Sequence, residues 1–154
     1  MATSWKKGRG NLGAFAPLLG SWVAKADSPM GPVSCTRVFE RFMSDKFVQL
    51  TATWAFGVGE KAQVYREHAI FGHFDGHIRF WSFTNDGKRS EGEIATAADL
   101  HPEAIAFEAE MSAGRARMAY WPAEDGGMHW AAEAKTRKGW SRMASHHYHA
   151  AEAT

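Results

Sequence analysis

The sequence contains little cysteine, no long apolar run and no excess of charge of either sign. Its single cysteine, Cys35, cannot form a disulfide within the chain, which fits a reducing compartment. Eighteen Lys and Arg residues are balanced by seventeen Asp and Glu residues, so the basic surface typical of nucleic-acid-binding proteins is missing. No stretch reaches the roughly 18 apolar residues that span a membrane. We therefore expect a cytoplasmic protein with no nucleic-acid partner and no membrane span.

The composition is that of a folded chain. Of the 154 residues, 45% are hydrophobic and 23% are charged, a balance that supports a buried core and excludes intrinsic disorder as the main state. This length suits one domain. We predict a single domain over residues 12–149, with an N-terminal tail at 1–11 and a C-terminal tail at 150–154.

Short segments in which polar and apolar residues alternate follow one another along most of the chain. A period of two predicts β-strands. The ten predicted strands span residues 21–26, 33–43, 47–56, 62–74, 77–84, 89–97, 104–111, 115–121, 128–134 and 140–149. Turn residues such as Asp75-Gly76 lie between them and tolerate the positive φ of tight hairpins.

Consecutive hairpins either leave exposed strand edges or close on themselves. Because closure removes unpaired edges, we predict an all-β fold, an antiparallel up-and-down β-barrel of about ten strands, in preference to a sandwich. Residues 12–19 precede the first strand and are compatible with a short N-terminal helix.

The segment Leu-Leu-Gly-Ser-Trp that ends at Trp22 resembles the Gly-x-Trp opening of lipocalins and the wider calycin group. Further similarities lie at residues 65–72, 75–76, 80–83 and 92–93. Together these features resemble bacterial lipocalin-like domains of unknown function. The resemblance implies a barrel closed at one end by a short helix, with Trp22 packed beneath the lumen. The long first loop and paired cysteines of secreted lipocalins are absent from the sequence, so their ligands are not carried over.

Cross-strand pairing separates a charged face from an apolar face in the last four predicted strands. Hairpins at residues 113–114 and 136–139 place Glu110 opposite Arg117 and Glu133 opposite Arg142. Such pairs contribute only about 0.2–1 kcal/mol each, so we place them in water. The other face, predicted to point inward, carries Phe107, Met111, Met118, Tyr120, Met128, Trp130 and Met143. These side chains either line a cavity for an apolar ligand or simply fill the barrel.

Glu67 is the candidate polar group of the interior. With Asp75-Gly76 as a two-residue turn, Glu67 and Phe71 share a face with Phe80 and Ser82. Taking this face as the inner one surrounds Glu67 with aromatic rings and hydroxyls. Tyr65 and Ser82 are then its expected hydrogen-bond partners.

Three roles are open for Glu67. It anchors a ligand, acts as a general base in apolar surroundings, or is a structural carboxylate bonded to backbone, Arg37 or Arg41. The second role corresponds to an isomerase, cyclase or decarboxylase acting on a hydrophobic substrate.

Histidines cluster near the C-terminus. His147 and His149 lie an even number of positions after Met143, so we expect them to point inward as Met143 does. Nitrobindins, which are haem-carrying barrels, resemble this layout with a late proximal histidine. Haem with His147 as its ligand is therefore an alternative hypothesis. We otherwise expect no cofactor and no metal site, because His73 and His129 lack the spacing of a closed site.

Binding is the favoured function. We expect a non-enzymatic, lipocalin-like protein that holds a small apolar molecule in a hydrophobic cavity of the barrel. The predicted ligand-binding residues are Trp22, Tyr65, Glu67, Phe71, Phe80, Ser82, Phe107, Met118, Tyr120, Trp130 and Met143. The remaining alternative is a packed barrel whose surface binds protein. Exposed tryptophans would mark a homodimer surface, and the candidates are Trp5, Trp81, Trp121 and Trp140.

Overall fold

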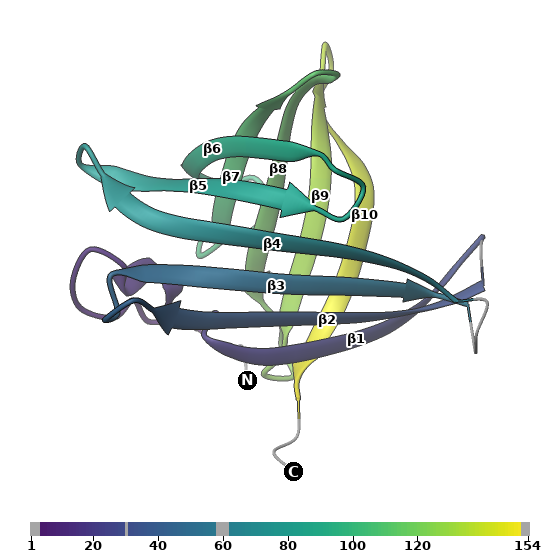
Figure 1. The fold of residues 1–154 in the computed structure, drawn as a ribbon, viewed down its shortest axis with the longest axis horizontal. Coiled ribbons are helices and arrows are strands. Elements are labelled where there is room, and N and C mark those ends of the chain that lie inside the picture. Colours follow the sequence, from purple (N-terminus) through teal and green to yellow (C-terminus); the bar gives the residue numbers. More distant parts are fainter. Residues whose placement is uncertain (1–3, 30, 58–61, 152–154) are drawn as a thin grey trace.

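The computed structural model describes residues 4–29, 31–57 and 62–151 of the chain. Within these residues, ten antiparallel strands close into a barrel in which each strand pairs with its sequence neighbours and the first pairs with the last (Figure 1). The strands are β1 (Gly20–Ser28), β2 (Gly31–Phe42), β3 (Phe47–Phe56), β4 (Gln63–Phe74), β5 (His77–Thr84), β6 (Arg89–Thr96), β7 (Ile105–Met111), β8 (Gly114–Pro122), β9 (Met128–Thr136) and β10 (Gly139–Ala150). The predicted all-β barrel is confirmed, and every predicted strand overlaps an observed one.

Local sequence explains the strands and the tight turns. In β2, alternate residues from Val33 to Phe39 are buried, so one face of this strand points to the interior of the barrel. Asp75 and Gly76 both have positive φ, 53° and 88°, as a two-residue hairpin requires. This turn pairs Phe71 with Phe80, which confirms the predicted register of β4 and β5.

One end of the barrel is closed by aromatic packing. The predicted short helix is a single 3-10 turn, η1 (Gly13–Phe15), at the end where β2 turns into β3 (Figure 1). The Phe15 ring lies 5.0 Å from Phe71 and 5.7 Å from Phe107, and these two rings are 4.8 Å apart. Trp22 donates its indole N–H to the Leu18 carbonyl at 2.8 Å and packs against this cluster.

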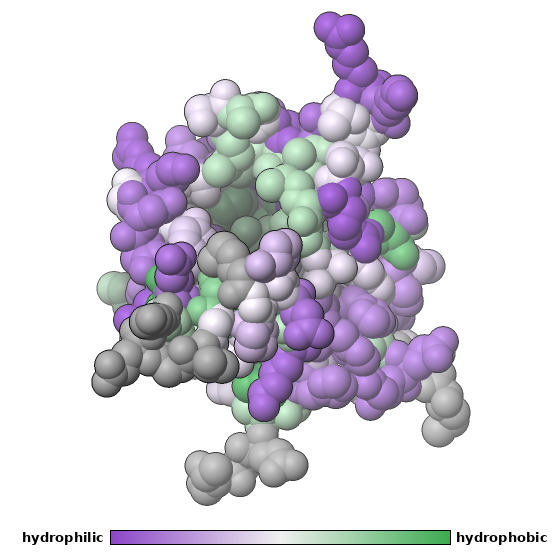
Figure 2. Space-filling view, turned by 90° about the vertical axis from the view of Figure 1, so that its right-hand side faces the viewer, coloured by the Kyte–Doolittle hydropathy of each residue, from purple (hydrophilic) through white to green (hydrophobic). Residues whose placement is uncertain are grey.

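One row of inward-facing side chains on β8, β9 and β10 is less buried than its neighbours. By strand alternation Met118, Ala132 and Ala144 face inward, yet each is only partly buried. Figure 2 views the end at which the turns after β1, β3 and β5 lie, and it shows apolar atoms around a hollow on that face. The interior is therefore packed differently at its two ends.

A seam interrupts the wall between the first and last strands. The register of β1 with β10 covers only Trp22 with Ala150 and Val23 with His149. Beyond Val23 the two strands diverge, and a pocket of about 480 Å³ lies there, lined in part by Cys35 and His147. Of its lining residues only Ala24 and Cys35 are buried, whereas side chains such as Ser34 and Thr36 alternate to the outside, so this pocket opens on the outer wall.

A bulge in β10 overturns the predicted orientation of its histidines. The pairing with β9 shifts between Arg142 and Ala144, which makes Met143 an extra residue, 69% exposed. The predictions that Met143, His147 and His149 point inward are therefore wrong. An extra residue moves every following side chain of the strand to the opposite face of the sheet. Tyr148, fully buried, takes the inward position instead.

The register of the β7–β8 hairpin also differs from the prediction. Glu110 pairs with Arg115 rather than with Arg117, because the turn comes one residue earlier in the chain. The resulting shift of two residues leaves each side chain on its predicted face. Glu133 pairs with Arg142 as predicted.

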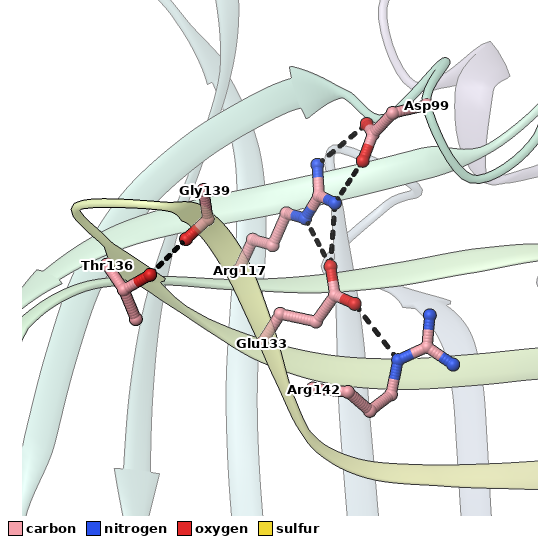
Figure 3. Close-up of polar contacts among 6 residues, drawn as sticks. All are labelled: Asp99, Arg117, Glu133, Thr136, Gly139 and Arg142. Atoms are coloured by element: carbon pink, nitrogen blue, oxygen red, sulfur yellow. Dashed lines mark hydrogen bonds and ion pairs between the residues drawn. The ribbon is translucent and has the colours of Figure 1, made fainter.

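An ion cluster on the outer wall connects the loop after β6 to β8, β9 and β10 (Figure 3). Arg117 donates to both Asp99 carboxylate oxygens at 3.0 and 2.6 Å, and to Glu133 at 2.9 and 2.6 Å. Arg142 donates to the second Glu133 oxygen at 2.9 Å. The ring of Trp140 covers Arg117 at 4.4 Å, so this outward-facing guanidinium is buried without entering the lumen.

The four tryptophans considered for a dimer surface are each partly buried. Cationic side chains lie over the rings of Trp81, Trp121 and Trp140. A homodimer stays a prediction. Among the described residues, no helix has the length and apolar character needed to cross a membrane.

Candidate ligand-binding site

Arg37 is a charged side chain at the centre of the barrel. The alternation of β2 turns it inward, where it is 0% exposed. Its Nη1 donates to the Tyr120 hydroxyl at 2.7 Å and its Nε donates to the Tyr148 hydroxyl at 3.2 Å. Within the described residues, Nη2 has no hydrogen-bond partner. A buried guanidinium thus keeps one donor group unused.

Aromatic rings surround this guanidinium. The Arg37 Cζ atom lies 4.5 Å from the ring centre of Trp130, 5.1 Å from Trp54, 5.5 Å from Tyr120 and 5.8 Å from Tyr148. All four distances are within the range of cation–π attraction. Burial alone would lower the pKa of Arg37, but Tyr120, Tyr148 and Glu67 outweigh it and raise this pKa, so Arg37 stays charged.

Glu67 lies in the same interior and is 8% exposed. The Ser82 hydroxyl donates to its Oε2, as expected for one of the two predicted partners. Its Oε1 has no partner within the described part of the chain. Tyr65, the other predicted partner, is exposed, and its ring lies 5.5 Å from Trp54.

Arg37 and Glu67 lie on either side of a single small residue. Ala52 of β3 pairs with Arg37 on one side and with Glu67 on the other. Two strand spacings separate the backbones of the two charged residues by about 9.6 Å. Ala52 is itself fully buried. Residues paired across neighbouring strands project to the same side of the sheet, so Arg37 and Glu67 both point into the interior, one on either side of Ala52.

His146 adds a third polar group to the interior. Its ring stacks on Trp130 with centroids 5.3 Å apart and planes 3° from parallel. Burial first, and then the charge of Arg37, lower the pKa of His146, so the imidazole is neutral near pH 7. Its Nδ1 is buried without a partner among the described residues.

Cys35 is the interior group with nucleophilic chemistry, and its surroundings suppress it. Burial raises the pKa of Cys35, which outweighs the lowering by Tyr148 and Arg37. A thiol held protonated is a weak nucleophile. Among the described residues, Cys35 is therefore not an activated thiol.

Most of the predicted ligand-binding residues named here lie in the closed end or in the lumen near Arg37, and one lies outside the barrel. Phe71, Phe80 and Phe107 contact one another in the closed end, at centroid distances of 4.8 to 6.0 Å. Tyr120 and Trp130 lie beside Arg37, and Met118 faces the lumen from β8. Trp22 lies near η1, while Met143 lies outside the barrel.

The sequence-based prediction missed part of the site. It included Arg37 only as a partner of Glu67, and it omitted Trp54, His146 and Tyr148. Arg37 lies an even number of positions from Val33 and Phe39, so the three side chains share one face of the strand. This spacing was a usable sequence signal for the inward orientation of Arg37. Tyr148 and His146 carried none, because their orientation depends on the bulge.

No model of a known protein family matches the sequence, and a search of curated proteins finds no match either. The closed ten-stranded antiparallel barrel is consistent with a lipocalin-like fold. Membership of the calycin group stays a prediction. Because His147 is exposed on the outer wall, it does not offer a haem ligand inside the barrel.

Proposed function

We propose that this protein binds a small, largely apolar molecule inside the barrel, with the polar end of that molecule held between Arg37 and Glu67. The observation that carries the proposal is the pair of unpartnered atoms, Arg37 Nη2 and Glu67 Oε1, buried on either side of Ala52. A buried polar atom without a partner costs about 1–3 kcal/mol, and more when it is charged. A guest that pairs with both atoms recovers this free energy.

The charges indicate which polar end fits best. Arg37 and Glu67 already balance each other, so an anionic guest would face repulsion from Glu67 and a cationic guest repulsion from Arg37. A neutral group with an acceptor for Arg37 and a donor for Glu67 avoids both penalties. A primary or cyclic amide has this chemistry, and the rings of Trp54 and Trp130 favour a planar body.

Two features support access of such a guest to the interior. Met118, Ala132 and Ala144 face inward but are only partly buried. A hollow with apolar walls lies on the end face shown in Figure 2.

Calorimetric titration with three matched probes tests the proposal: 2-naphthamide, 2-naphthoate and 2-methylnaphthalene. They share one ring system, and their substituents are a neutral amide, an anion and a methyl group. A hydrogen bond to a charged group is worth about 1.5–3 kcal/mol. We therefore expect 2-naphthamide to bind with 1:1 stoichiometry and roughly 10–100-fold more tightly than 2-methylnaphthalene. No saturable binding of any probe, or equal affinity for all three, would overturn the proposal.

Glu67→Gln separates ligand anchoring from a structural role. This change keeps the shape of the side chain, and it should weaken 2-naphthamide binding about tenfold or more. Met143→Ala, on the outer wall, is the matched control and should bind like the wild type. A Glu67→Gln protein that is less stable but binds normally would favour the structural carboxylate. The proton-transfer alternative for Glu67 stays a prediction.

A further inference from the structure

Three side chains with metal-ligand atoms meet on the outer wall, away from the lumen. His147 and His149 are two residues apart on the outer face of β10, and Asp125 comes from the turn between β8 and β9. The Nε2 atoms of His147 and His149 lie 3.1 and 3.0 Å from Asp125 Oδ2. All three ligand atoms lie within 4.8 Å of one another, and all three residues are exposed.

We propose that Asp125, His147 and His149 bind a divalent transition-metal ion, Zn²⁺ being the best fit, with one coordination position left open. Two ligands at about 2.05 Å from a tetrahedral ion lie about 3.3 Å apart, close to the observed spacing of the carboxylate from each imidazole. Two imidazoles favour Zn²⁺ over Ca²⁺ and Mg²⁺, which prefer oxygen ligands. Three protein ligands leave the fourth position for water or a small anion.

The carboxylate of this site is held in place by its own turn. The Gly127 N–H donates to Asp125 Oδ1 at 2.9 Å. A Cβ atom at Gly127 would lie 2.4 Å from the Tyr148 carbonyl oxygen and 3.3 Å from His147 Nε2, so a glycine here permits the close approach of turn and strand.

A neighbouring histidine restricts the movement of the His147 side chain. His129 of β9 pairs with His147 across the sheet, and their rings are 4.7 Å apart. The contact limits the rotamers of His147 and so reduces the ordering cost of binding.

The open position adjoins space for a second molecule. A pocket of about 440 Å³ is bounded by Asp125 and His147 together with His101, Trp121 and His129. An ion at the proposed site would lie at the rim of this pocket. A small anion or another oxygen ligand can then reach the metal without entering the barrel.

Metal titration of the untagged full-length chain, stripped with EDTA, tests the proposal. Calorimetry with ZnCl₂ at pH 7.5 should show one equivalent bound. Co²⁺ should give the visible absorption bands of a four-coordinate site. Asp125→Asn and His149→Gln should each weaken Zn²⁺ binding by at least the 10–100-fold that a change next to the ligands costs.

His77→Gln is the matched control. His77 forms another exposed histidine–carboxylate pair, with Glu93 at 2.8 Å, but belongs to no cluster of three metal-ligand side chains in the described part of the chain. This variant should bind Zn²⁺ as the wild type does. The proposal is overturned if Zn²⁺ uptake is not saturable, if Asp125→Asn and His149→Gln keep wild-type affinity, or if His77→Gln weakens binding to the same extent.

Discussion

Arg37 is a buried charge whose direct partners are phenols and indoles rather than a carboxylate. Two tyrosine hydroxyls accept its hydrogen bonds, and four aromatic rings surround it. Such an arrangement keeps the guanidinium charged while leaving Nη2 available. Its parity in β2 made the inward orientation of Arg37 predictable. Its partner Tyr148 was not predictable, because the bulge in β10 sets the orientation of that residue.

Tyr120→Phe tests the contribution of these phenols to stability. The change removes the acceptor of the 2.7 Å hydrogen bond and leaves Arg37 Nη1 buried without a partner. We expect the free energy of unfolding in urea to fall by about 1–3 kcal/mol. Tyr65→Phe is the control, since Tyr65 is exposed and Arg37 donates to Tyr120 and Tyr148 instead. Equal losses for the two variants would contradict this role of Tyr120.

At the scale of elements, the bulge in β10 decides which residues reach the lumen. One extra residue at Met143 turns Tyr148 and His146 inward and leaves His147 and His149 on the outer wall beside Asp125. The sequence of β10 gives no strong signal for this bulge, because the residues before and after the register shift each alternate as in a regular strand. The same local feature therefore creates part of the interior site and the proposed metal site.

Two methionine variants test the bulge. Met143→Ala should change the free energy of unfolding by no more than about 0.5 kcal/mol, because this side chain is 69% exposed. Met128→Ala should cost about 2–5 kcal/mol, because Met128 is fully buried on the lumen side of β9. Chemical denaturation measures both. Similar costs for the two variants would show that Met143 is buried and the bulge absent.

The loop after β6 is attached to the wall through Asp99, and this attachment should depend on pH. Hydrogen bonds from Arg117 hold the pKa of Asp99 below its ordinary value of 3.8. A carboxyl with a lowered folded-state pKa contributes stability above its unfolded pKa and loses it as the pH falls through the folded pKa. Because Asp99 is 57% exposed, we expect Asp99→Asn to cost at most about 1 kcal/mol at pH 7.

Urea unfolding at several pH values measures this dependence. The difference between the wild type and Asp99→Asn should be constant from pH 7 to pH 5 and should shrink below about pH 4. A difference that stays the same at pH 3 would mean that the charge of Asp99 does not stabilise the loop.

At the scale of the whole molecule, strand number, order and closure followed from alternation and turn residues. Asp75-Gly76 fixed one hairpin register, and the Glu133–Arg142 pair fixed the face of another. The seam between β1 and β10 was not predictable, because the chain ends meet only after the other strands have set their relative positions. The pairing of Arg37 and Glu67 across Ala52 depends on three registers at once, so single-strand patterns did not indicate it.

An NMR spectrum recording NOEs between 2-naphthamide and protein labelled at its alanine methyl groups locates the guest. Ala52 lies in the lumen between Arg37 and Glu67, whereas Ala119 and Ala131 alternate to the outer face of their strands. We predict NOEs from the probe to the Ala52 methyl. NOEs confined to Ala119 or Ala131, or none to any alanine at saturating probe, would contradict a binding site in the interior.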